Sequence, residues 1–469
     1  MLLKYFYDKA LAHASYMVGC QRTGEALIVD PGRDIDGYLA AAEAEGMTLV
    51  GMAETHIHAD YVSGARELAE RIGAKLYVSD EGPEDWKYFY AHDYDAVYLK
   101  DGDTFTIGNI KFEVMHTPGH TPESISFILT DMGGGADRPM GIFTGDFVFV
   151  GSVGRPDLLE KAAGVAGTAD SGARDMFKSV ERFKALPDYL QVWPAHGAGS
   201  ACGKGLGAIP SSTVGYEKMF NPAMAYDDEE AFVNYLLADQ PEPPTYFAVM
   251  KRVNKEGPMV LGEAGLPMQL APTAMSEILS AGHLVIDTRS ADEFAAAHVP
   301  GTINVPPNYL AHWAGWFIDY DKPVYLISSE GLLAEMVRVL RKIGVDRFGG
   351  YWLAAAVAEA GLNSEDYEVR SATELADAVL NQEVMVIDVR GAVEWNEGRL
   401  PNAEHLFLGG LLAKGKEAIN GKPVVVQCRT GGRSAIGASI LQAAGASKVI
   451  NMAGGITEWA EAGLPVEEA

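Results

Sequence analysis

Residues 54–64 read ETHIHADYVSG, and this stretch places two histidines and an aspartate directly after the apolar run LVGMA. In an extended chain alternate side chains point to the same side, so His56 and His58 would lie together. Imidazole and carboxylate groups are common metal ligands. Two polar loop residues would give the same pattern, so a metal site needs further ligands elsewhere in the chain.

Three more candidate ligands follow in order along the chain: His116 in MHTPGHT, Asp146 in FTGDFVF and His196 in WPAHGAG. Each ends a strand-like apolar run and has glycine or proline nearby. A rigid sheet edge can present such side chains to one cleft. Together with the histidine pair, they predict a metal site.

The first half of the chain alternates β-rich runs such as ALIVDPG and GIFTGDFVFV with helical patterns such as GARELAERIG. This alternation predicts an α/β domain. An acidic, proline-rich stretch, ADQPEPP, followed by NKEGP, predicts the end of this domain and a linker. We therefore expect a first domain over residues 1–255.

The rest of the chain repeats itself after about 100 residues. LVIDTRSADEFAAAHVPGTINVP, from Leu284, matches VMVIDVRGAVEWNEGRLPNAEHL, from Val384. This repeat predicts two similar domains, a first copy over residues 268–362 and a second copy over residues 370–469. In each copy a buried strand runs into a polar loop and then a helix, as in doubly wound α/β domains with parallel sheets.

The ligand pattern resembles that of the metallo-β-lactamase superfamily, whose hallmark is HxHxDH followed by His, Asp and His, and the resemblance covers about the first 250 residues. It implies an αββα sandwich. It also implies a two-metal arrangement in which the first ion takes His56, His58 and His116, the second takes Asp60 and His196 with a further histidine, and Asp146 bridges them. Tyr61 stands where that further histidine would be. A phenol with a pKa of about 10 is a poor ligand at neutral pH, so we expect one ion rather than two.

Within that superfamily the stretches ETHIHAD, MHTPGHTPESISF, FTGD and SVGRPDLL together resemble the persulfide dioxygenases. The resemblance implies one Fe(II) per chain held by His56, His116 and Asp146, with zinc as the alternative. This set of two histidines and one carboxylate leaves positions open for a persulfide sulfur and O2. His58, Asp60 and His196 would then orient these ligands or bound water, or act as partial ligands.

Arg155 and Asp157, in GRPDLL, match a stretch that lines the substrate pocket in that family, and we assign Tyr61 to the same pocket. An ion pair that stiffens the loop is an equally good reading of Arg155 and Asp157. Cys202, six residues after His196, is read as a buried bystander in preference to a thiol near the metal. The remaining histidines are read as ordinary loop or core residues: His13, His92, His120, His283, His298, His312 and His405.

Residues 427–439, QCRTGGRSAIGAS, follow the buried strand PVVV and open a helix. Backbone N–H groups, the positive end of the helix, Arg429 and Arg433 would all favour the thiolate of Cys428 and an anionic sulfur bound to it. This loop, the IDVR strand and MAGGITEWAEAGLPV resemble the rhodanese family over residues 370–469. The resemblance implies that Cys428 carries a sulfane sulfur as a persulfide.

The first copy aligns Ser328 with Cys428, and its loop reads SSEGLL. A serine hydroxyl cannot form a persulfide, and Glu330 would repel an anionic sulfur. We therefore expect the first copy to be catalytically inactive and to act structurally or to help define the substrate path.

The net charge of −27 disfavours nucleic acid and anionic membranes as partners. Three scattered cysteines argue for a reducing compartment, and no stretch reads as a signal peptide or a membrane span. We expect a cytoplasmic homo-oligomer.

The two resemblances imply oxidation of a low-molecular-weight thiol persulfide by O2 to sulfite, and then transfer of sulfur through Cys428 to sulfite, which gives thiosulfate. One alternative is a zinc-dependent thioester hydrolase of the glyoxalase II type fused to a sulfurtransferase. Another is a non-catalytic role in which the tandem copies dock sulfur-carrier partners around a structural metal.

Overall fold

The computed structural model describes residues 1–158, 160 and 167–468. It divides into two compact units, Met1–Ala264 with Arg341–Gly344, and Gly265–Leu340 with Val345–Ala469. The first unit is an αββα sandwich, and the second contains two α/β copies, so the predicted fold class is confirmed. The predicted domain boundaries stay predictions. Among the described residues, no helix has the length and apolar character that a bilayer crossing requires.

Two six-stranded sheets form the centre of the first unit. The first sheet has the order β1 (Leu2–Asp8), β2 (His13–Cys20), β3 (Glu25–Val29), β4 (Thr48–Ala53), β5 (Lys75–Ser79) and β6 (Ala96–Leu99). The second has the order β14 (Ser212–Thr213), β13 (Gln191–Pro194), β10 (Gly141–Gly145), β9 (Ile125–Asp131), β8 (Ile110–His116) and β7 (Thr104–Ile107). A separate ribbon pairs β11 (Val148–Phe149) with β12 (Ser152–Val153).

Strand β2 illustrates how these sheets form, because it is buried on both faces. Met17 packs toward the helices outside the first sheet, whereas Tyr16 and Val18 pack between the two sheets against residues such as Phe127 and Phe143. Because successive side chains of a strand point to opposite faces, β2 contributes to two hydrophobic clusters, one on each side of the sheet.

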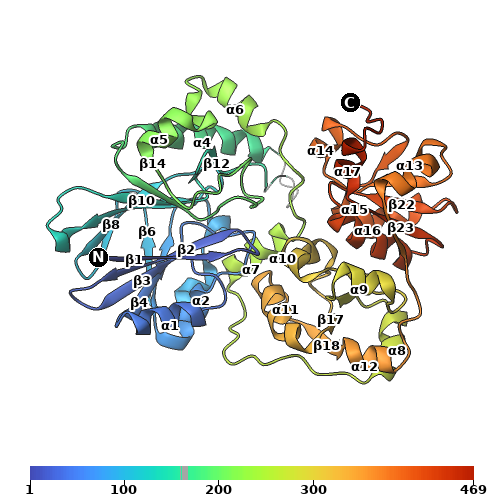
Figure 1. The fold of residues 1–469 in the computed structure, drawn as a ribbon. Helices are drawn as coiled ribbons and strands as arrows, with labels where there is room; N and C mark the ends of the chain where they lie inside the picture. Colours follow the sequence, from blue (N-terminus) through green and yellow to red (C-terminus); the bar gives the residue numbers. More distant parts are fainter. Residues whose placement is uncertain (159, 161–166, 469) are drawn as a thin grey trace. The chain divides into compact units, whose positions relative to one another are not determined.

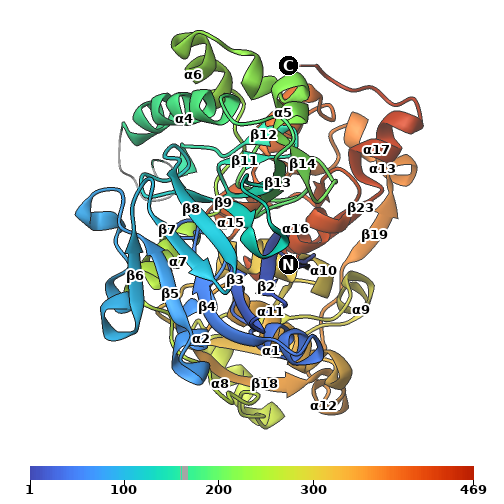
Figure 2. The ribbon, with the colours of Figure 1, turned by 90° about the vertical axis from the view of Figure 1, so that its left-hand side faces the viewer.

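Helices cover the outer faces of both sheets, with α1 and α2 on one side and α4, α5 and α6 on the other (Figure 1, Figure 2). In α4 the buried residues Ala173, Met176, Val180 and Phe183 recur every three or four positions, so they line one face against the second sheet. Among its described residues, the helices of this unit are α1 (Asp36–Ala44), α2 (Ala65–Ile72), α4 (Thr168–Lys184), α5 (Val214–Phe220), α6 (Glu229–Leu237) and α7 (Phe247–Glu256), with short 3-10 turns at Glu84–Trp86, Phe89–Asp93, Met132–Gly134 and Pro222–Ala225.

The second unit contains two parallel sheets with the same strand order, as the internal repeat predicts. The first copy has the order β16 (Ile303–Asn304), β15 (Val285–Asp287), β17 (Val324–Ser328) and β18 (Phe348–Leu353). The second copy has the order β21 (Ala403–His405), β20 (Met385–Asp388), β22 (Val424–Gln427) and β23 (Val449–Ala453), and adds β19 (Glu368–Ser371) at the edge next to β23.

Helices lie on both faces of the second copy's sheet. Val425 packs in the cluster formed with α13 and α17, whereas Val426 faces Gly437 of α16. The helices of the first copy are α8 (Met275–Ser280), α9 (Ala291–Ala296), α10 (Pro307–Phe317), α11 (Glu330–Lys342) and α12 (Ala354–Glu359), with a 3-10 turn at Pro272–Ala274. Those of the second copy are α13 (Ala372–Leu380), α14 (Ala392–Glu397), α15 (Leu408–Ala418), α16 (Gly432–Ala443) and α17 (Gly455–Glu461).

Candidate metal centre and sulfur-transfer loop

The candidate ligands lie in loops at the ends of strands of the sandwich. His56 follows β4, Asp146 follows β10, His196 follows β13, and His120 lies in the loop between β8 and β9. The prediction that strand ends carry candidate ligands is therefore confirmed for His56, Asp146 and His196. The sequence indicates only an ordinary loop or core role for the fourth residue, His120.

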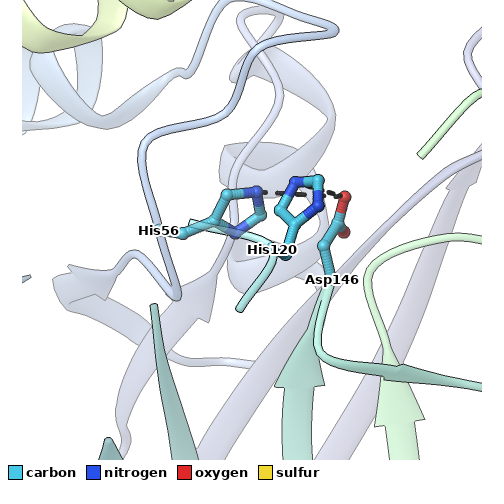
Figure 3. Close-up of side chains that lie close together, drawn as sticks. All are labelled: His56, His120 and Asp146. Atoms are coloured by element: carbon cyan, nitrogen blue, oxygen red, sulfur yellow. Dashed lines mark ion pairs between the residues drawn. The ribbon is translucent and has the colours of Figure 1, made fainter. Parts of the chain in front are cut away.

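One group of ligand atoms consists of His56, His120 and Asp146, all buried and with one ligand atom from each within 4.8 Å of the others. The carboxylate of Asp146 lies 3.9 Å from Nε2 of His56 and 3.5 Å from Nε2 of His120. Figure 3 shows these three side chains pointing toward one another. Two imidazoles and one carboxylate in this arrangement are the donor set of a mononuclear non-haem iron or a zinc site.

Hydrogen bonds at Nδ1 orient the imidazoles. The Nδ1–H groups of His120 and His196 donate to backbone carbonyl oxygens at 3.1 and 3.0 Å. The Thr55 hydroxyl donates its proton to Asp30, so Nδ1–H of His56 must donate to Thr55 Oγ1, 3.0 Å away. Nε2 of His56 and Nε2 of His120 can therefore present lone pairs to the centre, which is the state that binds a metal ion.

The structure corrects the predicted assignment of His116, which does not lie in this group. His116 is the last residue of β8, its side chain is partly exposed, and its Nε2 lies 2.9 Å from the carbonyl oxygen of Pro122. The strand holds this ring outside the buried group. His120 takes the place that the sequence argument gave to His116.

The turn before His120 explains this placement. Gly119 has a φ of 147°, and a Cβ on it would lie 2.6 Å from Met176 of α4. Only glycine fits there, so the chain can turn tightly against α4 and direct His120 inward. The PGH sequence is the signal that could have identified His120, because it places the histidine after the turn and not on the strand.

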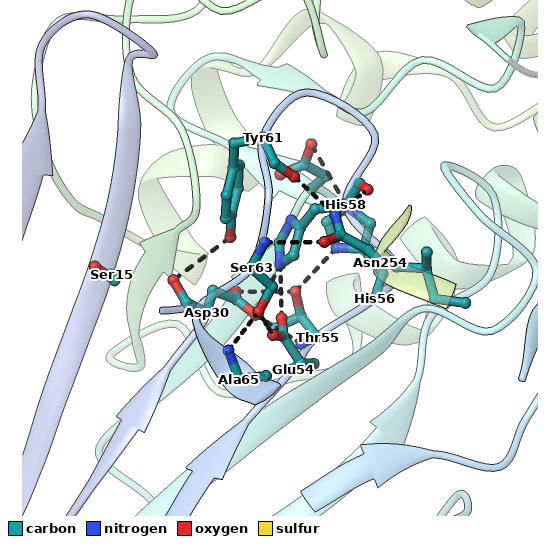
Figure 4. A network of polar contacts seen from close by, with 12 residues as sticks. Ser15, Asp30, Glu54, Thr55, His56, His58, Tyr61, Ser63, Ala65 and Asn254 are labelled. Carbon is teal, nitrogen blue, oxygen red and sulfur yellow. Dashed lines mark hydrogen bonds and ion pairs between the residues drawn. The ribbon is translucent and has the colours of Figure 1, made fainter. Parts of the chain in front are cut away.

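His58 points away from this group and interacts with two buried carboxylates, as Figure 4 shows. Its Nε2 lies 3.0 Å from Glu54 and 3.2 Å from Asp30. Burial alone would lower the pKa of His58, but these carboxylates outweigh it and raise the pKa well above its usual value. Glu54 also accepts the hydroxyl of Ser63. His58 therefore stabilises the loop between the candidate ligands.

A second ligand group contains Asp60, His196 and Cys202. Nε2 of His196 lies 3.1 Å from the carboxylate of Asp60 and 3.4 Å from Oδ1 of Asp146, so Asp146 lies between the two groups. The sequence favours a bystander role for Cys202, but the structure places its sulfur beside the ligand atoms of Asp60 and His196. Burial raises the pKa of the Cys202 thiol.

Several buried polar atoms in these groups have no hydrogen-bond partner among the described residues: Nε2 of His56 and His196, both carboxylate oxygens of Asp146, and Oδ1 of Asp60. Buried polar atoms are normally satisfied. Burial, together with the neighbouring imidazoles, also lowers the pKa of His56 well below its usual value, so this ring is neutral. Unsatisfied acceptors and neutral imidazoles that converge on one place fit a bound cation.

Tyr61 is fully buried and lies 3.9 Å from the ring of His13, measured between ring centres. Burial, with the charge of Asp30, raises the pKa of the Tyr61 phenol well above its usual value, so it stays protonated. Arg155 and Asp157 form a buried ion pair with two contacts of 2.8 Å, as one of the two readings predicts. Contact of these three residues with a substrate stays a prediction, and Leu159, the last residue of GRPDLL, lies outside the described residues.

Asn254 of α7, far from these ligands in sequence, anchors the loop that carries them (Figure 4). Its side-chain amide donates to the carbonyl oxygens of His58 and Tyr61, both at 2.7 Å, and accepts from the backbone N–H of Ser63 at 2.9 Å. Asn254 is 2 % exposed, so water cannot replace these bonds. No sequence pattern indicated this role.

We expect the Asn254→Ala variant to bind its metal about 10- to 100-fold more weakly, because the ligand loop loses three buried hydrogen bonds. Metal retained after dialysis against increasing chelator, measured by mass spectrometry, reports this change. Asn234, exposed on α6, offers the matched control Asn234→Ala, which should retain metal like the unsubstituted protein. Equal retention by the two variants would contradict the anchoring role.

In the second copy, Cys428 lies between β22 and α16 and is 1 % exposed. Its Sγ accepts hydrogen bonds from the Gly431 N–H at 3.2 Å and the Ser434 hydroxyl at 3.5 Å. Arg433 is bound by both carboxylate oxygens of Glu394, at 2.6 and 2.7 Å. The loop therefore has the strand-to-helix setting that the sequence predicts, and Glu394 holds one of its two arginines.

In the first copy, Ser328 ends β17 at the position that matches Cys428. Ser328 is fully buried, and its hydroxyl contacts the carbonyl of the next residue at 3.3 Å. In the second copy, Arg429 is exposed. The first copy has Ser329 and Leu333 at the positions that match Arg429 and Arg433. The first copy thus lacks both the thiol and the cationic groups around it.

The model of the metallo-beta-lactamase superfamily matches residues 8–196, and the rhodanese-like domain model matches residues 271–352 and 371–462. A crystal structure titled as a metallo-beta-lactamase from Staphylococcus aureus is 44% identical, covers 75% of this chain and 98% of its own, and has a TM-score of 0.68. The chain belongs to the metallo-beta-lactamase superfamily. This metallo-beta-lactamase domain is followed by two rhodanese-like domains.

Two further similar proteins each cover about half of this chain. A beta-lactamase hydrolase-like protein of Xylella fastidiosa is 29% identical over 253 residues, which are 49% of this chain and 53% of that protein. The chain thus spans about half the length of that curated relative. The crystal structure titled ETHE1 from Myxococcus xanthus is 26% identical, covers 54% of this chain and 98% of its own, and has a TM-score of 0.44.

Proposed function

We propose that the chain oxidises a low-molecular-weight thiol persulfide with O2 and water to sulfite and thiol, and then transfers a sulfane sulfur from a second persulfide to sulfite through Cys428, giving thiosulfate. The observation that carries the proposal is the buried group of His56, His120 and Asp146, which occurs in one chain with a thiol held in a strand-to-helix loop.

The metal would be held by His56, His120 and Asp146. Iron bound there would supply the activation of O2 and of the persulfide sulfur. Thr55 and the backbone carbonyl of Arg155 would keep the two imidazoles in the ligand tautomer. These side chains supply only three donors, so positions are left for the substrates.

The neighbouring groups would bind and orient the substrate. Burial would raise the pKa of Asp60, but the charge of His196 outweighs it and lowers the pKa to about 2, so Asp60 is ionised at neutral pH. Conversely, burial would lower the pKa of His196, but Asp146 and Asp60 raise it well above its usual value. His196 can therefore donate a hydrogen bond or a proton to a sulfur or oxygen atom beside Asp146.

In the transfer reaction, Cys428 of the second copy would carry the sulfur. The Cys428 thiolate attacks the outer sulfur of a thiol persulfide, so a new S–S bond to Cys428 forms and the S–S bond of the donor breaks. The thiol leaves with the persulfide proton. The sulfur lone pair of sulfite then attacks the outer sulfur of the Cys428 persulfide. The S–S bond to Cys428 breaks, the thiolate is restored and thiosulfate leaves, so no external oxidant is required.

A zinc-dependent hydrolase fused to a sulfurtransferase is a second candidate, and one observation favours it. The group of Asp60, His196 and Cys202 could hold a second ion, with Asp146 between the two. Two ions of this kind would activate a water for hydrolysis. Tyr61 counts against this candidate, because its buried, protonated phenol stands where the superfamily has an imidazole.

Metal analysis and an oxygen electrode separate the two candidates. We expect the full-length protein, purified without added metal, to contain about one iron per chain and to consume O2 when glutathione persulfide is added. Zinc content without O2 uptake would reject the dioxygenase and favour the hydrolase.

A further inference from the structure

Gly432, in the first turn of α16, lies against a tyrosine from the other copy. A Cβ on Gly432 would lie 2.0 Å from the hydroxyl oxygen of Tyr309 in α10, and its two next neighbours would be ring carbons of Tyr309 at 2.7 and 3.0 Å. The φ of Gly432 lies outside the left-handed region, so the backbone itself would accept a side chain. Tyr309 therefore occupies the space beside the sulfur-transfer loop.

Aromatic contacts hold α10 in this position. A Cβ on Gly409, near the start of α15, would lie 2.3 Å from the ring of Trp316. The ring centres of Trp313 and Trp316 lie 6.0 and 5.2 Å from that of Phe407. These contacts join α10 of the first copy to the second copy next to its active loop, and Tyr309 lies at the end of α10 that reaches this loop.

The two copies are not equivalent at these positions. The strand pairing and the helix bounds give an offset of 101 residues in this part of the chain, so Tyr309, Trp313 and Trp316 correspond to Gly410, Lys414 and Glu417. Conversely, Gly432 corresponds to Leu332, whose side chain is 40% exposed. The copy without the thiol thus carries the aromatic side chains, and the copy with the thiol carries the glycines that admit them.

Several donors of the second copy near Cys428 already have partners. The Gly431 N–H and the Ser434 hydroxyl contact Sγ of Cys428, and Arg433 is bound by Glu394. The Tyr309 hydroxyl adds an O–H donor from outside the loop, on the side where Gly432 leaves space. A donor placed there suits a group that approaches the sulfur bound to Cys428.

We propose that Tyr309 is a sulfite-binding residue for sulfur transfer, and that its hydroxyl donates a hydrogen bond to an oxygen of sulfite as sulfite attacks the Cys428 persulfide. This inference rests on the proposed function and deepens it, because it makes the inactive copy part of the acceptor site. The hydrogen bond holds sulfite and takes no part in the first step, in which Cys428 is loaded.

The test uses the full-length Tyr309→Phe variant without O2, with glutathione persulfide as donor and added sulfite as acceptor. We expect the KM for sulfite to rise about tenfold, because a hydrogen bond to a charged group is lost. The rate at which Cys428 gains sulfur, followed by mass spectrometry, should not change. Tyr351→Phe is the matched control, since the Tyr351 hydroxyl is in the same copy and contacts Gln269.

A second pair of variants tests the contact itself. Gly432→Ala should strongly reduce thiosulfate formation, because its Cβ would collide with Tyr309, and Gly432→Ala combined with Tyr309→Ala should recover part of the loss. An unchanged KM for sulfite in Tyr309→Phe overturns the inference. So does a Gly432→Ala substitution that lowers thiosulfate formation by the same factor with Tyr309 and with Ala at position 309. If Cys428→Ser also forms thiosulfate at the original rate, the proposed sulfur-transfer function itself fails.

Discussion

Replacing His120 with alanine should reduce metal binding by at least about 100-fold and abolish O2 uptake with glutathione persulfide. The physical reason is that His120 contributes one of only three donors in its group, with Nε2 3.5 Å from the carboxylate of Asp146. Its removal leaves the imidazole of His56 and one carboxylate, too few to retain a divalent ion against a chelator. Metal content and O2 consumption of the purified variant measure both effects.

His116→Ala is the matched control, because it removes an imidazole only four residues away. The His116 ring is partly exposed and contacts the carbonyl of Pro122, so this variant should keep its metal and its O2 uptake. A variant at position 116 that loses its metal while His120→Ala keeps it would contradict the grouping of ligands seen in the structure.

This pair of histidines shows where sequence reasoning succeeds and where it stops. Strand ends were identifiable because apolar β-rich runs end at glycine or proline, and His56, Asp146 and His196 do lie there. The choice between His116 and His120 depended on a turn whose tightness comes from the approach of Gly119 to α4. That contact joins residues far apart in the sequence, so no local pattern predicts it.

The HxH pair shows a similar limit. A period of two predicts that both rings lie together, and the ring centres of His56 and His58 are indeed 4.2 Å apart. However, the Nε2 atoms face different partners, because Asp30 and Glu54 attract His58 away from Asp146. Asp30 comes from the end of a different strand, and its charge could not be placed without the fold.

The internal repeat predicted the second unit well, because the same residue types about 100 residues apart gave the same strand order twice. The repeat also identified the loss of the thiol at Ser328. It could not predict which surfaces of the copies meet, since that depends on pairs such as Tyr309 and Gly432, which share no motif.

Replacing Cys428 with serine should reduce thiosulfate formation from glutathione persulfide and sulfite by about a thousandfold or more, because the hydroxyl cannot carry a sulfane sulfur. O2 uptake by the same variant should stay within about twofold of the original value, since the metal ligands belong to the other compact unit. The same preparation therefore gives two readouts, one for each reaction.

Cys20→Ser is the matched control for this substitution, because Cys20 ends β2 in the first unit and contacts Asn109 rather than any candidate ligand. It should form thiosulfate at the original rate. If Cys428→Ser also formed thiosulfate at the original rate, the sulfurtransferase role would fail. A role in which the tandem copies only dock sulfur-carrier partners would then be favoured. If both activities of Cys428→Ser were lost together, the two units would depend on each other, and Cys428 could not be assigned to the transfer step alone.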